Sequence, residues 1–92
     1  MWKGSYLLRY RRFFQQPLKP DYAETFNKRG LARSAKGDVE GALQDYSEAI
    51  RLKPDFALAF YNRGNARKDT GDLEGAAQDL AEATRLGYKP KN

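Results

Sequence analysis

The chain has 92 residues, a formal net charge of +5 and a charged fraction of 32%, which suits one small domain with a limited core. It contains neither Cys nor His, and this excludes disulfide bonds, thiolate zinc sites, cysteine nucleophiles and imidazole acid–base chemistry. No apolar run approaches the ~20 residues that a membrane span requires, so we expect a soluble, cytoplasmic protein.

The first part of the chain, residues 1–22, is basic and aromatic. All its charged side chains up to residue 16 are bases, namely Lys3, Arg9, Arg11 and Arg12. We predict a helix here that caps the exposed end of the following array. The alternatives are an arm that binds nucleic acid or an anionic membrane surface, a targeting peptide, or a disordered segment.

Residues 23–56 and 57–90 carry one pattern twice, at an offset of 34 residues. Arg29-Gly30 recurs as Arg63-Gly64, and many further positions are identical without any gap. A fixed period of this size is typical of repeat arrays whose units cannot bury their apolar faces alone. The sequence therefore predicts two units of a repeat protein.

Each unit is predicted to be a pair of helices. In the first unit Asp21 is a good N-cap, Gly37 stops the first helix, and Asp38 caps a second helix over residues 39–52. In the second unit we expect Asp55 as the N-cap of a helix over residues 56–69, the turn Gly71-Asp72, and a helix over residues 73–86. The predicted fold class is all-α, with tandem antiparallel helical hairpins at 23–56 and 57–90.

The small and large residues predict how each hairpin packs. Gly30 with Ala42, and Gly64 with Ala76, let the paired helices approach closely. Phe26 and Phe60 are expected to be the large core side chains. Four arginines beside them are interpreted as structural, with stems on apolar surface and heads directed to water or to acids such as Asp45 and Asp79; they are Arg29, Arg33, Arg63 and Arg67.

Nothing in the pattern indicates an enzyme. The sequence has no glycine-rich phosphate loop followed by Lys and Ser/Thr, and no metal-ligand constellation. The carboxylates recur in both units, which favours helix caps and solvated faces over a catalytic site; in the first unit they are Asp38, Glu40, Asp45 and Glu48. We predict a protein without catalytic activity, cofactor or metal.

The motif Phe26-x-x-Arg29-Gly30-x-x-Arg33, continued by Ala42-x-x-x-Tyr46, Ala49 and Pro54, resembles the tetratricopeptide repeat family. The second unit repeats it with Phe60-x-x-Arg63-Gly64-x-x-Arg67, Ala76-x-x-x-Leu80 and Ala83. Departures are Phe for the usual Trp, Arg for Leu and for Tyr, and Tyr88 at the closing Pro. The resemblance implies an α-solenoid fragment that binds a protein partner, as an extended peptide or a helix, in a concave groove lined by the first helices.

The second unit is expected to be the last of the array. Leu43, Tyr46 and Ile50 of the first unit become Ala77, Leu80 and Thr84, so the face that would receive another hairpin is less apolar. We predict that the array ends near Leu86 and that residues 87–92 form a short tail.

A helical wheel selects the candidate groove residues as those opposite Phe26, Gly30 and their repeats. They are Asn27, Lys28, Leu31, Tyr61, Asn62, Asn65 and Lys68. The asparagines could bind a peptide backbone, Tyr61 and Leu31 would supply apolar contact, and the lysines would attract carboxylates. The alternative is an ordinary polar face. A clamp for chaperone C-terminal tails is disfavoured, because Asn27 and Leu31 stand where that clamp requires Lys and Asn.

Three hypotheses of function follow from these patterns. The first is a protein-binding module that uses the groove. The second is self-association into a homo-oligomer, because two hairpins are fewer than the ~3 repeats that stability usually requires. The third is attachment to nucleic acid or anionic lipid through the basic arm of residues 1–16.

Overall fold

The computed structural model describes residues 21–90, which contain four α-helices and no strand. They are α2 (Tyr22–Ala35), α3 (Val39–Leu52), α4 (Ala57–Asp69) and α5 (Leu73–Arg85). The all-α class and the helical hairpins are therefore confirmed, and the predicted bounds of α3 match. The capping helix predicted for the N-terminal segment lies outside the described residues.

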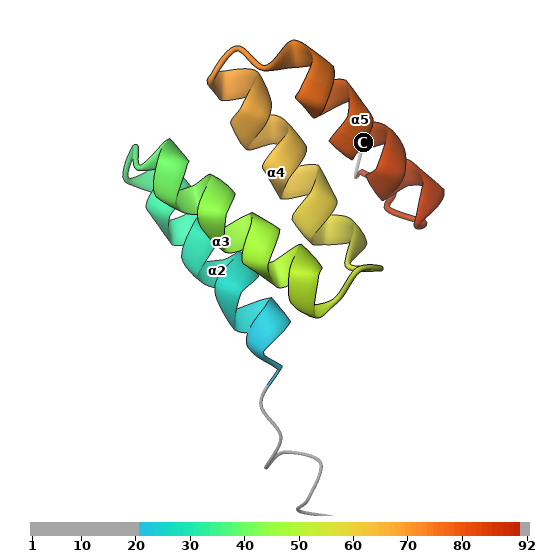
Figure 1. Cartoon of the computed structure of the whole chain (residues 1–92), viewed down its shortest axis with the longest axis horizontal. Coiled ribbons are helices and arrows are strands. Elements are labelled where there is room, and N and C mark those ends of the chain that lie inside the picture. Colours follow the sequence, from blue (N-terminus) through green and yellow to red (C-terminus); the bar gives the residue numbers. More distant parts are fainter. Residues whose placement is uncertain (1–20, 91–92) are drawn as a thin grey trace, which may run out of the picture.

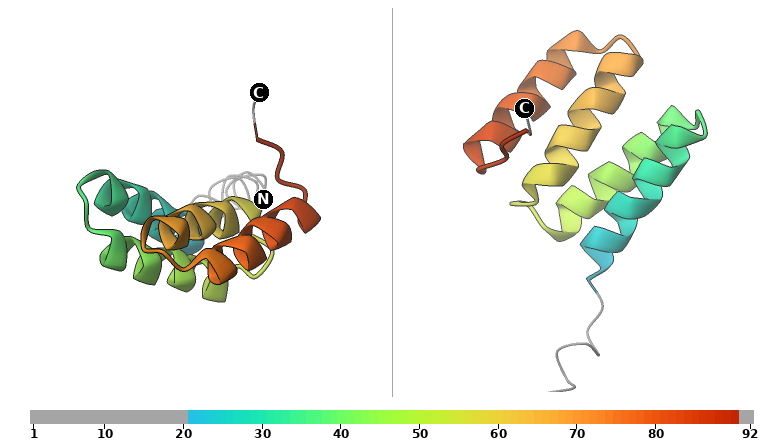
Figure 2. Two further views of the ribbon diagram at one scale, coloured as in Figure 1. Left: turned by 90° about the horizontal axis from the view of Figure 1, so that it is seen from above. Right: turned by 180° about the vertical axis from the view of Figure 1, so that it is seen from behind.

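Successive helices pack against one another, α2 on α3, α3 on α4 and α4 on α5. Viewed from above, α2 and α4 form one layer while α3 and α5 form the other (Figure 1 and Figure 2). The first helices of both hairpins therefore lie in the same layer, which is the arrangement that the 34-residue repeat predicts.

Aspartates and glycines delimit the helices as expected. Asp38 accepts a hydrogen bond from the amide of Gly41 at 2.9 Å, and Asp72 accepts one from Gly75 at 2.9 Å. Each bond satisfies an amide that the first turn of a helix leaves without a backbone partner. Gly37, at the turn between α2 and α3, has a φ of +89°, which a side chain would disfavour.

The N-cap predicted at Asp55 is wrong. The N-cap of α4 is Phe56, which makes no side-chain cap hydrogen bond. The reason lies in the turn, where the amide of Phe56 donates to the carbonyl of Lys53 at 3.0 Å and Asp55 is held before the first helical turn. At the equivalent place Asp21 does cap its helix, accepting from the amide of Glu24 at 3.2 Å.

The core consists mostly of alanine, with one large ring. Tyr46 is 2% exposed and is the largest fully buried side chain in the described residues. A Cβ added at Gly30 would lie 2.6 Å from Cε1 of Tyr46, so the missing side chain of Gly30 makes room for this ring. The other buried apolar residues are Ala23, Ala42, Ala49, Ala59, Ala66, Ala76 and Ala83.

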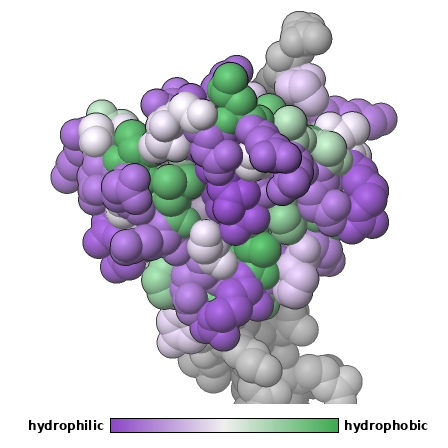
Figure 3. Space-filling model, turned by 45° about the horizontal axis from the view of Figure 1, so that its top comes forward, coloured by the Kyte–Doolittle hydropathy of each residue, from purple (hydrophilic) through white to green (hydrophobic). Residues whose placement is uncertain are grey.

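The expectation that Phe26 and Phe60 are the large core side chains is wrong, because both are only half-buried. The guanidinium of Arg29 lies 5.4 Å from the centre of the Phe26 ring, and that of Arg63 lies 5.6 Å from the Phe60 ring. Each phenylalanine is thus covered by a cation from its own helix. On the face that Figure 3 shows, apolar residues accordingly appear as small separate areas among polar ones.

Candidate functional site

The predicted groove residues fall into two groups. Lys28 and Leu31 on α2 and Lys68 on α4 are exposed, whereas Tyr61 and Asn65 on α4 are half-buried. Leu58, one turn before Asn62 on α4, is also exposed. We call these six residues of α2 and α4 the first-helix face: Lys28, Leu31, Leu58, Tyr61, Asn65 and Lys68.

Asn27 and Asn62 form the second group, because both side chains are buried. Nδ2 of Asn62 donates a hydrogen bond to Oδ1 of Asn27 at 3.0 Å, which joins α4 to α2. A buried amide needs such a partner, since burying it unpaired is costly. The bond and the burial leave these two side chains little accessible to a ligand, so they are not part of the first-helix face.

Tyr61 has a partner that the sequence pattern did not indicate. The ring of Tyr88, which follows α5, stacks on the Tyr61 ring with centroids 4.3 Å apart and planes inclined by 29°. Desolvation, followed by the neighbouring Tyr61 hydroxyl, raises the pKa of the Tyr88 hydroxyl above its ordinary value. The one signal in the sequence was that Tyr88 stands where the first unit has Pro54.

Each described hairpin pairs two arginines with one buried aspartate. Arg29 donates to both carboxylate oxygens of Asp45, at 2.9 and 2.8 Å, and Arg33 donates to the same group at 3.4 Å. The Asp45 hydrogen bonds, followed by its charge, raise the pKa of Arg29. This agrees with the structural role predicted for these arginines.

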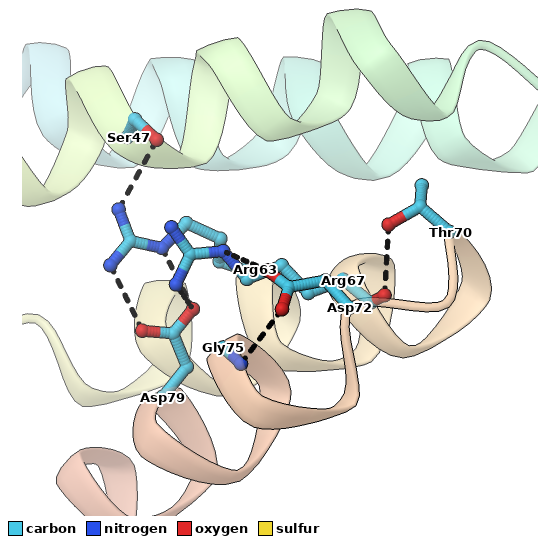
Figure 4. Close-up of polar contacts among 7 residues, drawn as sticks. All are labelled: Ser47, Arg63, Arg67, Thr70, Asp72, Gly75 and Asp79. Carbon is cyan, nitrogen blue, oxygen red and sulfur yellow. Dashed lines mark hydrogen bonds and ion pairs between the residues drawn. The ribbon is translucent and has the colours of Figure 1, made fainter.

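The second hairpin repeats this cluster (Figure 4). Arg63 donates to both oxygens of Asp79 at 2.8 and 2.9 Å, and Arg67 donates to one of them at 2.9 Å. Arg63 also reaches the hydroxyl of Ser47 on α3 at 3.2 Å, so this cluster links the two hairpins. Asp45 and Asp79 are buried, and the expectation that Asp45 lies on a solvated face is wrong, because the arginines enclose it.

The described residues offer no arrangement for metal chemistry. Between residues 21 and 90, no three His, Cys, Asp or Glu side chains are grouped so that they could hold a metal ion. None of the helices in the same range is long and apolar enough to cross a membrane. The accessible chemistry of the first-helix face is therefore that of leucine, tyrosine, asparagine and lysine side chains.

Comparison with known families agrees with the repeat seen in the structure. Residues 33–71 match the family described as TPR repeat, and residues 57–86 match the family described as Tetratricopeptide repeat. No curated protein matches the chain significantly. Repeats of this kind generally serve as protein–protein interaction modules and are typically non-enzymatic scaffolds. With its helical hairpins and two family matches, this chain belongs to the tetratricopeptide repeat family.

Proposed function

We propose that the chain is a protein-binding module that takes a partner peptide or helix on the first-helix face. The observation that carries this proposal is that α2 and α4 share a layer and expose leucines beside lysines. Leu31 is 45% exposed and Leu58 is 39% exposed, and Lys28 and Lys68 are exposed on the same two helices. Burying such apolar side chains on binding is favourable.

The composition of the face defines the partner's chemistry. Leucine side chains favour apolar residues of the partner, and lysine ammonium groups favour its carboxylates through charge-assisted hydrogen bonds. The buried acids Asp45 and Asp79 are already bound by arginines and do not offset these lysines directly. A peptide that carries both apolar and acidic residues fits the composition of this face.

A charge-reversal experiment tests the electrostatic part. Wild-type protein captures partners from lysate of the source cells, and the affinity of each identified partner is then measured with purified protein by isothermal titration calorimetry. We expect Lys28→Glu/Lys68→Glu to weaken binding at least tenfold. The matched control Lys36→Glu/Lys53→Glu changes the net charge equally at exposed sites that follow the last residues of α2 and α3 and should bind within twofold of wild type.

A second pair of variants tests the apolar part. Leu31→Asp/Leu58→Asp should abolish binding of the same partner. Leu73→Asp is the control, because Leu73 is 65% exposed on α5 and lies in the other layer. Partner binding that Leu73→Asp weakens as strongly as Leu31→Asp/Leu58→Asp does would argue against the first-helix face.

A further inference from the structure

The two hairpins meet at a joint that consists of α3 and α4. Ala66 of α4 is buried in one cluster with Ala42 and Tyr46 of α3, and Val39 and Leu43 pack against that cluster. The Asn27–Asn62 hydrogen bond closes the same joint in the layer of first helices. A joint of this kind is therefore formed by one face of a first helix and by the hairpin that precedes that helix in the chain.

Within the part of the chain that the structure describes, each side of this joint occurs a second time on an exposed surface. At the 34-residue offset, Ala32 on α2 corresponds to Ala66 and is exposed, whereas Ala66 is 2% exposed. Leu73 and Ala77 on α5 correspond to Val39 and Leu43, and both are exposed. The α2 end of the array thus exposes a face equivalent to the one that α4 buries in the joint. The α5 end exposes a face equivalent to the one that α3 buries there.

Tyr88 lies at the end that would receive another hairpin. Asn27 contacts the first helix of the following hairpin through Asn62. Tyr61 corresponds to Asn27 at the same offset, but its contact is the ring of Tyr88. In Figure 2 the tail rises from the end of α5 to the layer of α2 and α4, beside α4 and on the side away from α2. The Tyr88 ring thus contacts α4 at the position where, one repeat earlier, α2 is contacted by Asn62 of the next first helix.

We propose that the docking partner for the α4–α5 end is a second copy of this chain, and that Tyr88 blocks the docking. The α2 helix of the second copy would lie against α4 and α5, with its Ala32 near Leu73 and Ala77. Its Lys28, which corresponds to Asn62, would face the Tyr61 ring as a cation over an aromatic face. Such an interface is head-to-tail, so it joins copies into open chains or rings instead of isologous dimers.

The chain itself indicates that the docking partner is a second copy. The complementary face is present on α2 of every copy, and the interface continues the geometry of the joint that α3 and α4 already form. The new joint is weaker than the old one, because Ala77 and Thr84 replace Leu43 and Ile50. We therefore expect the stacked ring of Tyr88 to compete with it. Lys28 and Tyr61 belong both to this interface and to the first-helix face, but the proposal does not rest on partner binding at that face.

Sedimentation velocity of the full chain over a hundredfold concentration range tests the proposal. Wild type and Tyr88→Phe, which retains the stacked ring, should remain monomeric. Tyr88→Ala should self-associate, with a weight-average mass that rises with concentration beyond that of a dimer. Because Tyr88 follows the last helix, all three proteins should have the same helical circular dichroism. A Tyr88→Ala protein that is helical and monomeric throughout would overturn the proposal, as would equal association of all three.

Two double variants identify the surface that associates. Tyr88→Ala/Ala32→Glu places a charge on the docking face of α2 and should be monomeric again. Tyr88→Ala/Ala35→Glu places the same charge on an exposed position of α2 outside that face and should associate as Tyr88→Ala does. Undiminished association of the Ala32→Glu double variant would show that copies meet elsewhere and would overturn the head-to-tail assignment.

Discussion

The two hairpins have the same helices and turns but fill the space beside their mid-helix glycine differently. In α2–α3 the ring of Tyr46 lies against Gly30, where an added Cβ would be 2.6 Å from Cε1. In α4–α5 Leu80 takes this place, and an added Cβ at Gly64 would be 3.0 Å from its Cγ. Tyr46 is fully buried, whereas Leu80 is half-buried. The same glycine therefore has a stricter role in the first hairpin.

Identical charged residues also differ between the hairpins in the exposure of their side chains to solvent. The Arg29 side chain is 53% exposed, whereas the Arg63 side chain is 17% exposed. Arg63 lies between the hairpins and reaches Ser47, but Arg29 has no earlier hairpin in the described residues to cover it. The comparison teaches that position in the array, more than residue type, decides how much an ion pair of this kind is shielded from water.

Truncating the buried ring should have the largest effect. We expect Tyr46→Ala to lower the free energy of unfolding by about 3–5 kcal/mol, as for other buried aromatic truncations. Leu80→Ala should cost about 2 kcal/mol, because Leu80 is half-buried. Urea unfolding followed by circular dichroism measures both. Equal costs for the two variants would show that the hairpins do not differ in the way described.

The next largest difference in stability between the hairpins is expected when the mid-helix glycine of each is replaced by alanine. Gly30→Ala forces a methyl group into a rigid ring, and overpacking of this kind costs about 1–3 kcal/mol. Gly64→Ala meets Cγ of Leu80 at 3.0 Å and the backbone carbonyl oxygen of Ala76 at 3.2 Å, which is less crowded than residue 30. Its gain of about 1 kcal/mol of helix propensity offsets part of the overpacking, so it should be less destabilising than Gly30→Ala. Thermal or urea unfolding measures the difference.

The same comparison can be sharpened by exchanging the partner side chain. Gly30→Ala/Tyr46→Leu gives the first hairpin the leucine of the second and should recover stability relative to the sum of its single changes, because the two residues are in contact. Strict additivity would contradict the proposed contact between residues 30 and 46.

Neutralising the buried carboxylates should show a smaller difference. Asp79→Asn removes the charge that Arg63 and Arg67 bind, and Asp45→Asn does so for Arg29 and Arg33. We expect Asp79→Asn to be the more destabilising variant, by about 1 kcal/mol, since its hydrogen-bond partners are less exposed. Urea unfolding at low and at high salt measures this difference, and added salt should reduce the cost of Asp45→Asn more than the cost of Asp79→Asn, because the Asp45 ion pair is the more exposed one. The reverse order of stability would refute the argument from shielding.

The smallest expected effect is the loss of stability at alkaline pH, where the tyrosines ionise. Desolvation, followed by the charge of Asp45, raises the pKa of Tyr46 above its ordinary value. A raised folded-state pKa favours the neutral phenol, so its stabilisation is fully present below the unfolded pKa of about 10 and is lost as pH rises through the folded pKa. Tyr46→Phe should therefore lose less stability than wild type above that pH in urea titrations. Among residues 21–90 the pKa of Tyr88 is also raised, so Tyr88→Phe should change the pH dependence in the same direction.

Much of the fold could be predicted because its signals are local. The period of 34 residues, the aspartate caps and the positive-φ glycines act within a few residues of chain, and they placed α3 without error. The prediction of an N-cap at Asp55 was wrong because a backbone hydrogen bond between Phe56 and Lys53, in the same turn, moves the start of α4 by one position. Side-chain chemistry alone does not reveal such a shift.

The candidate site was harder to predict because it depends on contacts between distant residues. A helical wheel places Asn27 and Asn62 on one face, but their mutual bond arises only when the hairpins stack. Likewise, the wheel identifies Tyr61 and cannot identify the tail residue that stacks on it. For the same reason the sequence pattern did not show that Tyr46 is the buried ring, because its burial depends on the contact with Gly30 of the neighbouring helix.

The amide pair between Asn27 and Asn62 has a consequence for how the chain assembles. Alanines such as Ala59 and Ala66 line the inner side of α4, and a surface of small, similar side chains tolerates sliding of one helix along another. A slip by one helical turn would separate the two amides and leave both without a partner in an apolar setting. The hydrogen-bonded pair therefore specifies the register of the two hairpins, because only one register has a low free energy.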